Sequence, residues 1–301
     1  MFRSLIVPAL LLGASLTSAN ASAPAPRAAT PDEWAAACKD WDDWDRPGPP
    51  LRIHAHAWYV GTCGISAILL TSRQGHVLID SGTEGGAEAV AANIRRLGFR
   101  LRDVKLLLHS HEHFDHVGGH AAIVRQTGAR VVASADAAPS LASGRDSHGD
   151  PQAGSLKPFA PVAVSRIVAD GDVVRLGPLA LTAHATPGHT PGALSWTWTS
   201  CEQGRRDCRR IVYADSLSAI SADHYRFSDH PAYVATFRAG IARLPALPCD
   251  ILITPHPSAS GFRERLLRGD LTQPEGQCAS YAATAGQRLD DRLAREAEAR
   301  R

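Results

Sequence analysis

The sequence predicts an α/β fold in which strands and helices occur in two similar halves. The chain has 301 residues, of which 44% are hydrophobic, so it is long enough to bury one large core. Short alternating or apolar runs bounded by glycine-containing or polar turns indicate strands. Segments with apolar residues at helical spacing follow the strands in each half. We expect residues 51–301 to form a single domain, which is a simpler arrangement than two small ones.

The first half is predicted to start as an antiparallel meander and to continue with helices. The runs at 53–60, 65–71 and 76–80 are separated by polar or glycine-containing turns, as strands of a meander are. Residues Glu84–Leu97 place Ala, Val, Ile and Leu side chains at helical spacing. The other elements expected in this half are a strand at 104–108, a helix at 118–127, a strand at 130–133 and a short helix near Asp136.

The second half opens with a long polar segment at 144–161, whose Gly, Pro, Asp and His residues show little periodicity. We expect this segment to be a surface loop that borders a site. Further strands are predicted at 164–168, 172–175, 179–184, 193–199 and 210–214. They are followed by a helix at Pro231–Leu244, a strand at Asp250–Thr254 and a solvated C-terminal helix at Tyr281–Arg300.

The first 21 residues are expected to be a secretory signal peptide. They combine a positive start, a mostly apolar stretch at 5–16 and small residues at 18–23 that offer Ala-x-Ala cleavage sites. Cleavage after Ala21 is favoured, because a cut two residues later would be followed by Pro24. A retained membrane anchor is the alternative, which so short an apolar run disfavours. Residues 22–50, rich in Ala, Pro and Asp, should form an N-terminal arm on the domain.

Charge and cysteine usage narrow the class of protein. The formal net charge is +2 with acidic and basic residues nearly balanced, which argues against a nucleic-acid or membrane partner and favours small-molecule chemistry. The six cysteines are an even number in a chain expected to be exported, which indicates disulfides. Cys201 and Cys208 flank a polar loop and can pair locally, while the other pairings and buried free thiols stay open. The absence of CxxC spacing disfavours a cysteine-rich zinc site.

The segment His111–His116 places four metal-binding side chains within six residues. It reads His-Glu-His-Phe-Asp-His and follows the apolar run at 104–108. Zinc binds imidazole nitrogen and carboxylate oxygen, and two His separated by one residue on a turn can hold one ion while the Asp-His pair turns toward a second. The alternative is a polar loop that happens to be rich in His. We expect a hydrolytic zinc centre at this loop.

Two further His lie downstream among turn-forming prolines. His189 stands between two Pro-Gly turns in the segment Thr186–Gly192, and His256 lies between Pro255 and Pro257 after a buried-looking strand. Each of them alone would more often be a structural or surface His. Together with the first motif they supply six ligands, which is enough for two metal ions.

These motifs resemble the metallo-β-lactamase superfamily, and most closely its subclass B3 β-lactamases. The likeness runs from about Trp58 to the C-terminal helix, and it includes Tyr59–Gly64, Ile79–Gly82 and Tyr213–Ser218. It implies an αββα sandwich, in which two mixed sheets pack face to face with helices outside.

Carried over position by position, the resemblance implies two zinc ions per chain. The first ion would be bound by His111, His113 and His189, and the second by Asp115, His116 and His256. The ions would share a hydroxide, because coordination lowers the pKa of water to about 7. Asp115 would orient this hydroxide, so no protein nucleophile is needed.

The strand end at Asp215–Ser216 separates two classes within the family. The resemblance to subclass B3 implies that Ser216 faces the second zinc, with Asp215 turned aside. Relatives such as thioesterases, lactonases and phosphodiesterases commonly place a bridging Asp here. A slip of one residue along a strand exchanges its two faces. A bridging Asp215 would therefore favour the lactonase or thioesterase alternative.

The resemblance also implies substrate-binding residues and disulfides. Ser216 and Ser218 look like the hydroxyls that receive a substrate carboxylate and an ordered water, with ordinary strand-end hydrogen bonding as the alternative. Gln152 in the long loop resembles a substrate-facing residue, although a loop position without a role fits it equally. Asp80 is expected to orient the His-rich loop. The implied disulfide pairs are Cys249–Cys278, Cys201–Cys208 and Cys38–Cys63.

Together with export, the resemblance implies a periplasmic di-zinc β-lactamase that hydrolyses penicillins, cephalosporins or carbapenems and so confers antibiotic resistance. One zinc ion would polarise the lactam carbonyl, and the other would stabilise the nitrogen anion released when the ring opens. The alternatives are a secreted lactonase or thioesterase of the same fold and a non-catalytic zinc-binding protein, which a site without thiolates disfavours. No heptads or long apolar stripe indicate assembly, so we expect a monomer.

Overall fold

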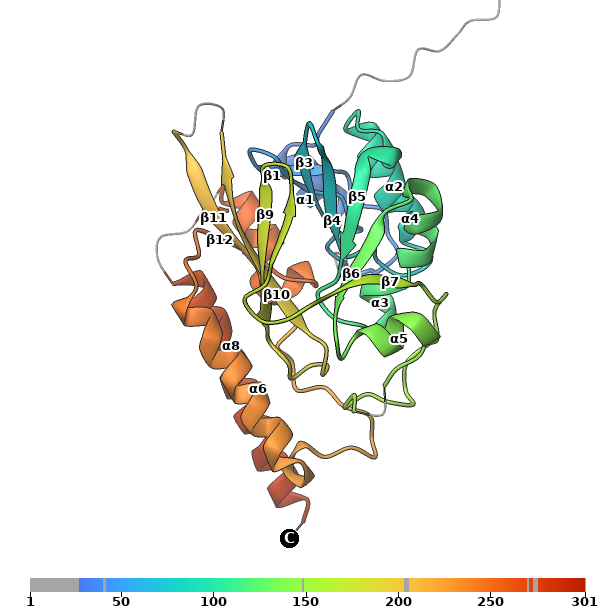
Figure 1. Cartoon of the computed structure of the whole chain (residues 1–301). Coiled ribbons are helices and arrows are strands. Elements are labelled where there is room, and N and C mark those ends of the chain that lie inside the picture. The colour runs from blue at the N-terminus through green and yellow to red at the C-terminus, as the bar shows by residue number, and fades with distance from the viewer. Residues whose placement is uncertain are drawn as a thin grey trace, which may run out of the picture.

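Two β-sheets face each other in the middle of the molecule, and helices pack against their outer surfaces (Figure 1). The computed structural model describes residues 27–39, 42–147, 149–202, 206–269, 271–272 and 276–300. Both sheets contain parallel and antiparallel strand pairs, which confirms the expected αββα sandwich. The expected signal peptide lies outside the described residues. Over the described ranges, no helix has the length and apolar character needed to cross a bilayer.

The first sheet contains seven strands in chain order. The meander from β1 to β4 is antiparallel, whereas β4 to β7 are parallel and need crossovers, which helices supply. The strands are β1 (Leu51–His54), β2 (Ala57–Tyr59), β3 (Ile68–Ser72), β4 (Gly75–Ile79), β5 (Val104–Leu108), β6 (Arg130–Ser134) and β7 (Val164–Val168). The crossover helices are α2 (Ala87–Arg96), α3 (Phe114–Val117), α4 (His120–Thr127) and α5 (Ala138–Ser143).

The second sheet contains five strands in the order β12-β11-β10-β9-β8. Only its edge pair, β11 with β12, is parallel. The strands are β8 (Val173–Leu176), β9 (Leu179–Ala185), β10 (Leu194–Cys201), β11 (Cys208–Tyr213) and β12 (Ile251–Ile253). Two long helices, α6 (Pro231–Arg243) and α8 (Gln277–Glu298), lie side by side on the outer face (Figure 1).

Alternate residues of each strand divide between the central core and the outer cores. In β11, Ile211 and Tyr213 are buried between the sheets, whereas Val212 packs among residues of α6 and α8. In β4, Leu78 likewise packs outward among residues of α2. This division follows from the two-residue period of a strand, and it fixes the register, because a shift of one residue would exchange the side chains of the central core with those packed under the helices.

The structure corrects three expectations about the elements. Residues 53–60 do not form one strand, because a tight turn at Ala55 separates β1 from β2, and Ala55 has a φ of +46° that interrupts the extended chain. Residues 118–127 contribute only part of a helical region, which is divided into α3 and α4. The C-terminal helix α8 begins at Gln277, before the expected start.

The short helices α1 and α7 were not predicted, although the sequence before α1 contains a recognisable helix-capping pattern. α1 (Pro31–Ala37) starts at Thr30, whose side chain accepts a hydrogen bond from the backbone N–H of Glu33, while the Glu33 carboxylate accepts one from Thr30 N–H. This is a capping box, with a proline in the first turn as helices favour. The other helix, α7 (Phe262–Leu267), follows Gly261, which adopts a left-handed conformation.

Three disulfides fasten the outer segments to the sandwich. They join Cys38 with Cys63, Cys201 with Cys208, and Cys249 with Cys278, which are the pairs that the family resemblance implies. The first holds the N-terminal segment, where Trp34 packs edge-on against Tyr59 and Phe262. The described part of the expected arm is therefore packed into the domain surface.

The strand ends that carry the candidate ligands meet at one edge of the sandwich. In the first sheet β4 and β5 are parallel, so the residues after both strands leave at the same end. In the second sheet β9, β11 and β12 share one direction, because β9 and β11 both run antiparallel to β10. A hydrogen bond of 2.7 Å from Leu194 N–H to Ser110 O joins the two sheets there.

Candidate metal centre

Three predicted ligands, His111, His113 and His189, gather around one point. The first two follow β5, and the third follows β9. The ring centroids of each pair of these imidazoles are 4.8 Å apart. One nitrogen from each lies within 4.8 Å of the others, which suits a shared cation, and all three residues are buried.

Each of these imidazoles is held from behind by a hydrogen bond to its other nitrogen. Nδ1 of His111 lies 2.8 Å from Asp215 Oδ1, and Nε2 of His113 lies 2.8 Å from Asp150 Oδ2. Nδ1 of His189 lies 3.1 Å from the carbonyl oxygen and 3.0 Å from Oγ of Ser218. Such contacts fix ring orientation and tautomer in metal sites. The front nitrogens are then left for a cation.

The remaining ligands, Asp115, His116 and His256, form a second group beside the first. Asp115 Oδ2 lies 3.0 Å from His116 Nε2 and 3.3 Å from His256 Nε2, and these two nitrogens are 3.3 Å apart. The rings of His111 and His116 are 4.2 Å apart, so the two groups adjoin. All six predicted ligands are therefore brought together.

The protonation equilibria indicate a site suited to cations. Burial would lower the pKa of His116, but the neighbouring carboxylates of Asp115 and Asp80 raise it to about 10. Burial would raise the pKa of Asp115, but the charges of His116 and His256 lower it well below its usual range. Without metal, the protonated His116 imidazole therefore balances the charge of the Asp115 carboxylate, and a bound cation would take over that role.

Two imidazoles of the first group, those of His111 and His189, have lowered pKa values instead. Burial and the other imidazoles lower the pKa values of His111 and His189 well below the ordinary value. These rings are therefore neutral near pH 7, as metal ligands must be. Nε2 of His111 is buried and has no hydrogen-bond partner among the described residues. A buried polar atom without a partner calls for an explanation, and a metal ion in front of it provides one.

Asp80 holds the start of the His111–His116 segment in place, as the sequence suggested. Its carboxylate accepts hydrogen bonds of 2.7 Å from the N–H and from the hydroxyl of Ser110, and another of 2.7 Å from Tyr213. It also lies 3.5 Å from Nδ1 of His116. Asp80 has a φ of +60°, a left-handed conformation that Asp tolerates better than most residues and that is common at functional sites.

The strand end at Asp215–Ser216 has a definite orientation. The Asp215 carboxylate contacts the back of His111 and is fully buried. The backbone around it is fixed by Tyr281, whose hydroxyl donates to Asp215 O at 2.8 Å and accepts from Leu217 N–H at 3.2 Å. Ser216 is also buried, and its Oγ has no partner within the part of the chain described here. The hydrogen-bonding capacity of this hydroxyl is therefore unused by the described residues.

The long loop borders the metal centre through a residue that the sequence did not single out. Asp150 accepts a 2.7 Å hydrogen bond from the backbone N–H of Gln152 through Oδ1, while its other oxygen contacts His113. Gln152, expected to face substrate, is half-buried beside it. Asp150 lies 37 positions from His113 in the sequence, and no local pattern marks it as a partner.

Aromatic and cationic side chains form a rim next to His256. The ring of Trp44 lies 5.5 Å from that of His256 and 5.9 Å from that of Phe114, and Trp44 is 39% exposed. The Nζ atom of Lys157, from the long loop, lies 5.9 Å from the Phe114 ring. The N-terminal segment thus contacts His256, and the long loop contacts Phe114, the residue before Asp115.

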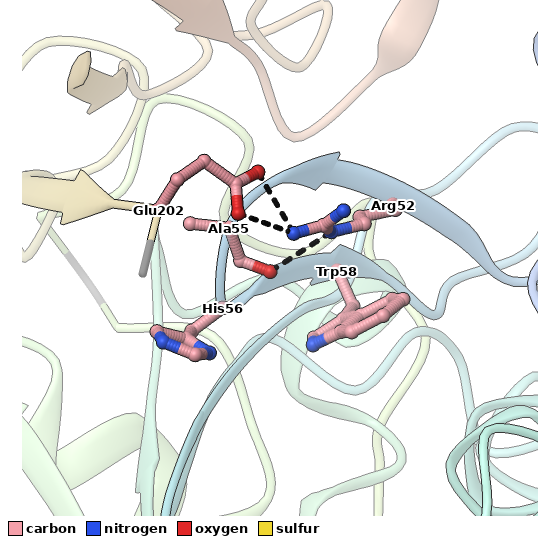
Figure 2. A pocket seen from close by; sticks show the side chains of 5 residues that line it. All are labelled: Arg52, Ala55, His56, Trp58 and Glu202. Carbon is pink, nitrogen blue, oxygen red and sulfur yellow. Dashed lines mark hydrogen bonds and ion pairs between the residues drawn. The ribbon is translucent and has the colours of Figure 1, made fainter. Parts of the chain in front are cut away.

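A separate hollow of about 480 Å³ lies at the other end of the sandwich (Figure 2). The far end of β10 contributes Glu202, whose carboxylate oxygens accept hydrogen bonds of 2.8 Å from Arg52. Arg52, Ala55, His56 and Trp58 form its other walls. It contains none of the candidate ligands, and its charged groups are already paired, so it adds nothing to the metal centre.

The comparisons with known proteins agree with this geometry. A family model described as the metallo-beta-lactamase superfamily matches residues 60–201. The solved structure of MIM-2 metallo-beta-lactamase is 52% identical in sequence, with a TM-score of 0.85 over 89% of this chain and 99% of that one. The chain belongs to the metallo-beta-lactamase superfamily. It is therefore related to metal-dependent hydrolases, whose metal is typically zinc.

Two other similar proteins differ in how much of this chain they match. MEM-A1, a subclass B3 metallo-beta-lactamase isolated from a soil metagenome library, is 47% identical with a TM-score of 0.82, over 85% of this chain and 99% of that one. The hydroxyacylglutathione hydrolase of Anaeromyxobacter dehalogenans is 33% identical over 177 residues, or 58% of this chain. This match spans only 55% of that hydrolase. The likeness to subclass B3 structures is thus the more extensive.

Proposed function

We propose that the protein is a zinc-dependent β-lactamase that hydrolyses the amide bond of β-lactam antibiotics. The observation that carries the proposal is the position of Asp215, whose Oδ1 lies 2.8 Å from the back nitrogen of His111 and which belongs to neither group of described side chains placed to hold a metal ion. A bridging Asp at this strand end would have favoured a thioesterase or lactonase. The likeness to MIM-2 over nearly its whole length supports the same choice.

The two groups of side chains fit two zinc ions, because they offer five imidazoles and one carboxylate, which are ligands that zinc prefers. His111, His113 and His189 would hold the first ion, and Asp115, His116 and His256 the second. Bound zinc lowers the pKa of a coordinated water to about 7 and polarises a carbonyl oxygen. The catalytic contribution of the protein itself falls to Asp115, whose carboxylate would accept a hydrogen bond from the attacking water and direct it toward the lactam carbonyl.

We assign the substrate carboxylate and an ordered water to the hydroxyls of Ser216 and Ser218. The Oγ atom of Ser216 is buried and has no hydrogen-bond partner among the described residues, so a movement of this strand end that exposes it would break no hydrogen bond of that hydroxyl. Ser218 Oγ contacts His189 Nδ1. Substrate bound to this hydroxyl would therefore be connected through one hydrogen bond to His189, which would hold the first ion. Gln152 would contact the substrate from the long loop, which Asp150 anchors.

The second candidate is a zinc thioesterase, which the match to hydroxyacylglutathione hydrolases favours. A substrate panel separates the two. Zinc-loaded protein should open a penicillin, a cephalosporin and a carbapenem, and should act far more weakly on a glutathione thioester and an acyl-homoserine lactone. Excess chelator should abolish the β-lactam activity. Efficient thioester or lactone hydrolysis without β-lactam hydrolysis would contradict the proposal, as would β-lactam hydrolysis that persists in chelator.

We also propose that the chain is exported to the periplasm, where β-lactams meet their targets, and that residues 51–301 act there as a monomeric domain that confers resistance. The motivation is the composition of residues 1–21, together with three disulfides, which persist in oxidising compartments. N-terminal sequencing of protein from a periplasmic extract should begin at Ser22. A mature chain that retains Met1 would contradict export by this route, and sedimentation analysis would test the monomer.

A further inference from the structure

Glu112 lies between two candidate zinc ligands in the sequence, yet its side chain makes contacts in another direction. It is only 1% exposed. One carboxylate oxygen accepts a 2.6 Å hydrogen bond from the Thr190 hydroxyl, and the other accepts a 3.0 Å hydrogen bond from Gly192 N–H. Both contacts cross about 80 positions of sequence, as the separations of 78 and 80 show. Nothing in the proposed chemistry uses this carboxylate.

Both partners of Glu112 belong to the loop that carries His189. This loop, Thr186–Gly192, connects β9 to β10 and is held at its start by packing of Gly188 against α6, where an added Cβ would lie 2.0 Å from Phe237. After His189, the Thr190 hydroxyl and the Gly192 N–H are both bound by Glu112. The carboxylate therefore ties the loop of one ligand to the turn that presents His111 and His113.

We infer that Glu112 is a positioning residue for the first zinc ion, holding the His189 loop against the His111–His113 turn so that the three imidazoles converge before the ion binds. The inference rests on the metal site assigned under the proposed function. A carboxylate with two good hydrogen bonds suits this role, because charge-assisted bonds are stronger and more directional than neutral ones. A buried charge is costly as a purely structural element, since well-packed apolar residues often serve as well.

Substitutions of Glu112 and Thr190 can separate the effect of the hydrogen bonds from the effect of the negative charge. Glu112→Gln can keep both contacts, with its amide oxygen accepting from Gly192 N–H and its NH₂ donating to Thr190 Oγ1. Glu112→Ala removes both contacts and the charge. Thr190→Val removes one contact while keeping the charge and nearly the same shape. Glu88→Ala, on the exposed surface of α2, is the matched control, because its carboxylate contacts only Arg95 in the described structure.

The test is the zinc dissociation constant of each variant, measured by competition with a chromophoric chelator and therefore independent of turnover. We expect Glu112→Ala to weaken zinc binding about 10- to 100-fold, the usual effect of removing a residue that orients a ligand. Glu112→Gln should restore most of the affinity, Thr190→Val should fall between the two, and Glu88→Ala should match the wild type. The combination of Glu112→Ala with Thr190→Val should be no weaker than Glu112→Ala alone, because both remove the same tie.

Circular dichroism of each variant in excess chelator shows whether the metal-free protein is folded. If Glu112→Ala does not fold, Thr190→Val alone still tests the inference. Unchanged zinc affinity in folded Glu112→Ala or Thr190→Val would overturn the inference. A wild-type chain that binds no zinc would overturn both the inference and the proposed function. Weakened zinc binding in these variants of a protein that hydrolyses thioesters but not β-lactams would support the inference and contradict the proposed function alone.

Discussion

The Asp215 carboxylate stands directly behind the His111 ring, with Asp215 Oδ1 2.8 Å from His111 Nδ1 and both side chains fully buried. The contact makes Nδ1 the protonated nitrogen and leaves Nε2 as the lone-pair donor. The backbone of Asp215 is in turn held by Ser195, whose hydroxyl accepts from Asp215 N–H at 3.0 Å. The residues at this strand end thus fix the orientation of the His111 imidazole.

Asp215→Asn tests this contact. Burial raises the pKa of the Asp215 carboxyl well above its usual range, so its negative charge at this position depends on positive charge nearby, which a bound zinc ion would supply. The amide oxygen of the variant can still accept from Nδ1–H but cannot carry that charge, so we expect zinc binding about 10- to 100-fold weaker, with the zinc-saturated variant retaining measurable activity. Asp223→Asn, exposed in the following loop, is the control. Native mass spectrometry reads the number of ions bound. If Asp215 bridged two metals, the variant would lose the second ion at any zinc concentration, and the account would be wrong.

Asp150 should couple the long loop to the metal centre. Asp150→Ala removes the contact with His113 and the hydrogen bond from Gln152 N–H together, so both zinc binding and the KM for β-lactams should worsen. Asp150→Asn can preserve the His113 contact and should lie closer to the wild type. Steady-state kinetics at saturating zinc isolate the effect on KM. A change in zinc affinity with no change in KM would show that the loop is positioned by other contacts.

Trp44 should contribute to substrate binding rather than to metal binding. Trp44→Ala removes a half-exposed ring that lies against His256 and Phe114, and we expect KM to rise about 2- to 10-fold, as loss of one aromatic contact typically produces. Trp44→Phe should recover most of this loss. The zinc dissociation constant should stay near the wild-type value. If it rises as much as KM, then Trp44 acts by holding His256.

His120 makes the stability depend on pH. Burial lowers the pKa of His120 in the folded chain to about 3, whereas the ordinary pKa of a histidine side chain is 6.5. Above pH 6.5 both states are neutral, and below it the unfolded chain binds a proton that the folded chain does not, so stability falls between pH 6.5 and 3. Over the step from pH 7 to pH 5 this site should cost about 2 kcal/mol.

His120→Asn is the matching variant, because its amide can replace Nδ1 opposite the Ser81 hydroxyl, which lies 2.7 Å from that nitrogen. It should lose about 2 kcal/mol less than the wild type between pH 7 and pH 5, measured by urea unfolding of chelated protein so that zinc release does not contribute. Identical losses in the two proteins would contradict the assignment of a neutral, buried His120.

The sequence located the candidate ligands well, because four of them lie within one short motif. His189 and His256 were found through the prolines and glycines that surround them, which are signals of rigid turns. The residues that hold the candidate ligands in place were harder to predict from the sequence. Asp80 was anticipated by its place at a strand end, whereas Asp150 and Glu112 act across long sequence separations, and only the packing of the two sheets brings them to their partners.

The fold was predictable to a similar degree, and the errors in the predicted elements have local causes. The alternation of the strands gave most of their bounds, and the layering came from the family resemblance. The single strand expected at 53–60 was wrong because the turn at Ala55 contains no glycine to mark its positive φ. α1 was missed although its capping box, Thr30 with Glu33, was present in the sequence.

The most direct test of the central claim is a zinc titration of chelated protein in which the bound metal and the hydrolysis of a carbapenem are followed together. We expect two zinc ions to bind and hydrolysis to return as they bind. The variant His189→Ala should bind zinc less well at the first site and lose most of the activity. Full hydrolysis in metal-free protein, or two bound ions with no β-lactam hydrolysis, would contradict the account.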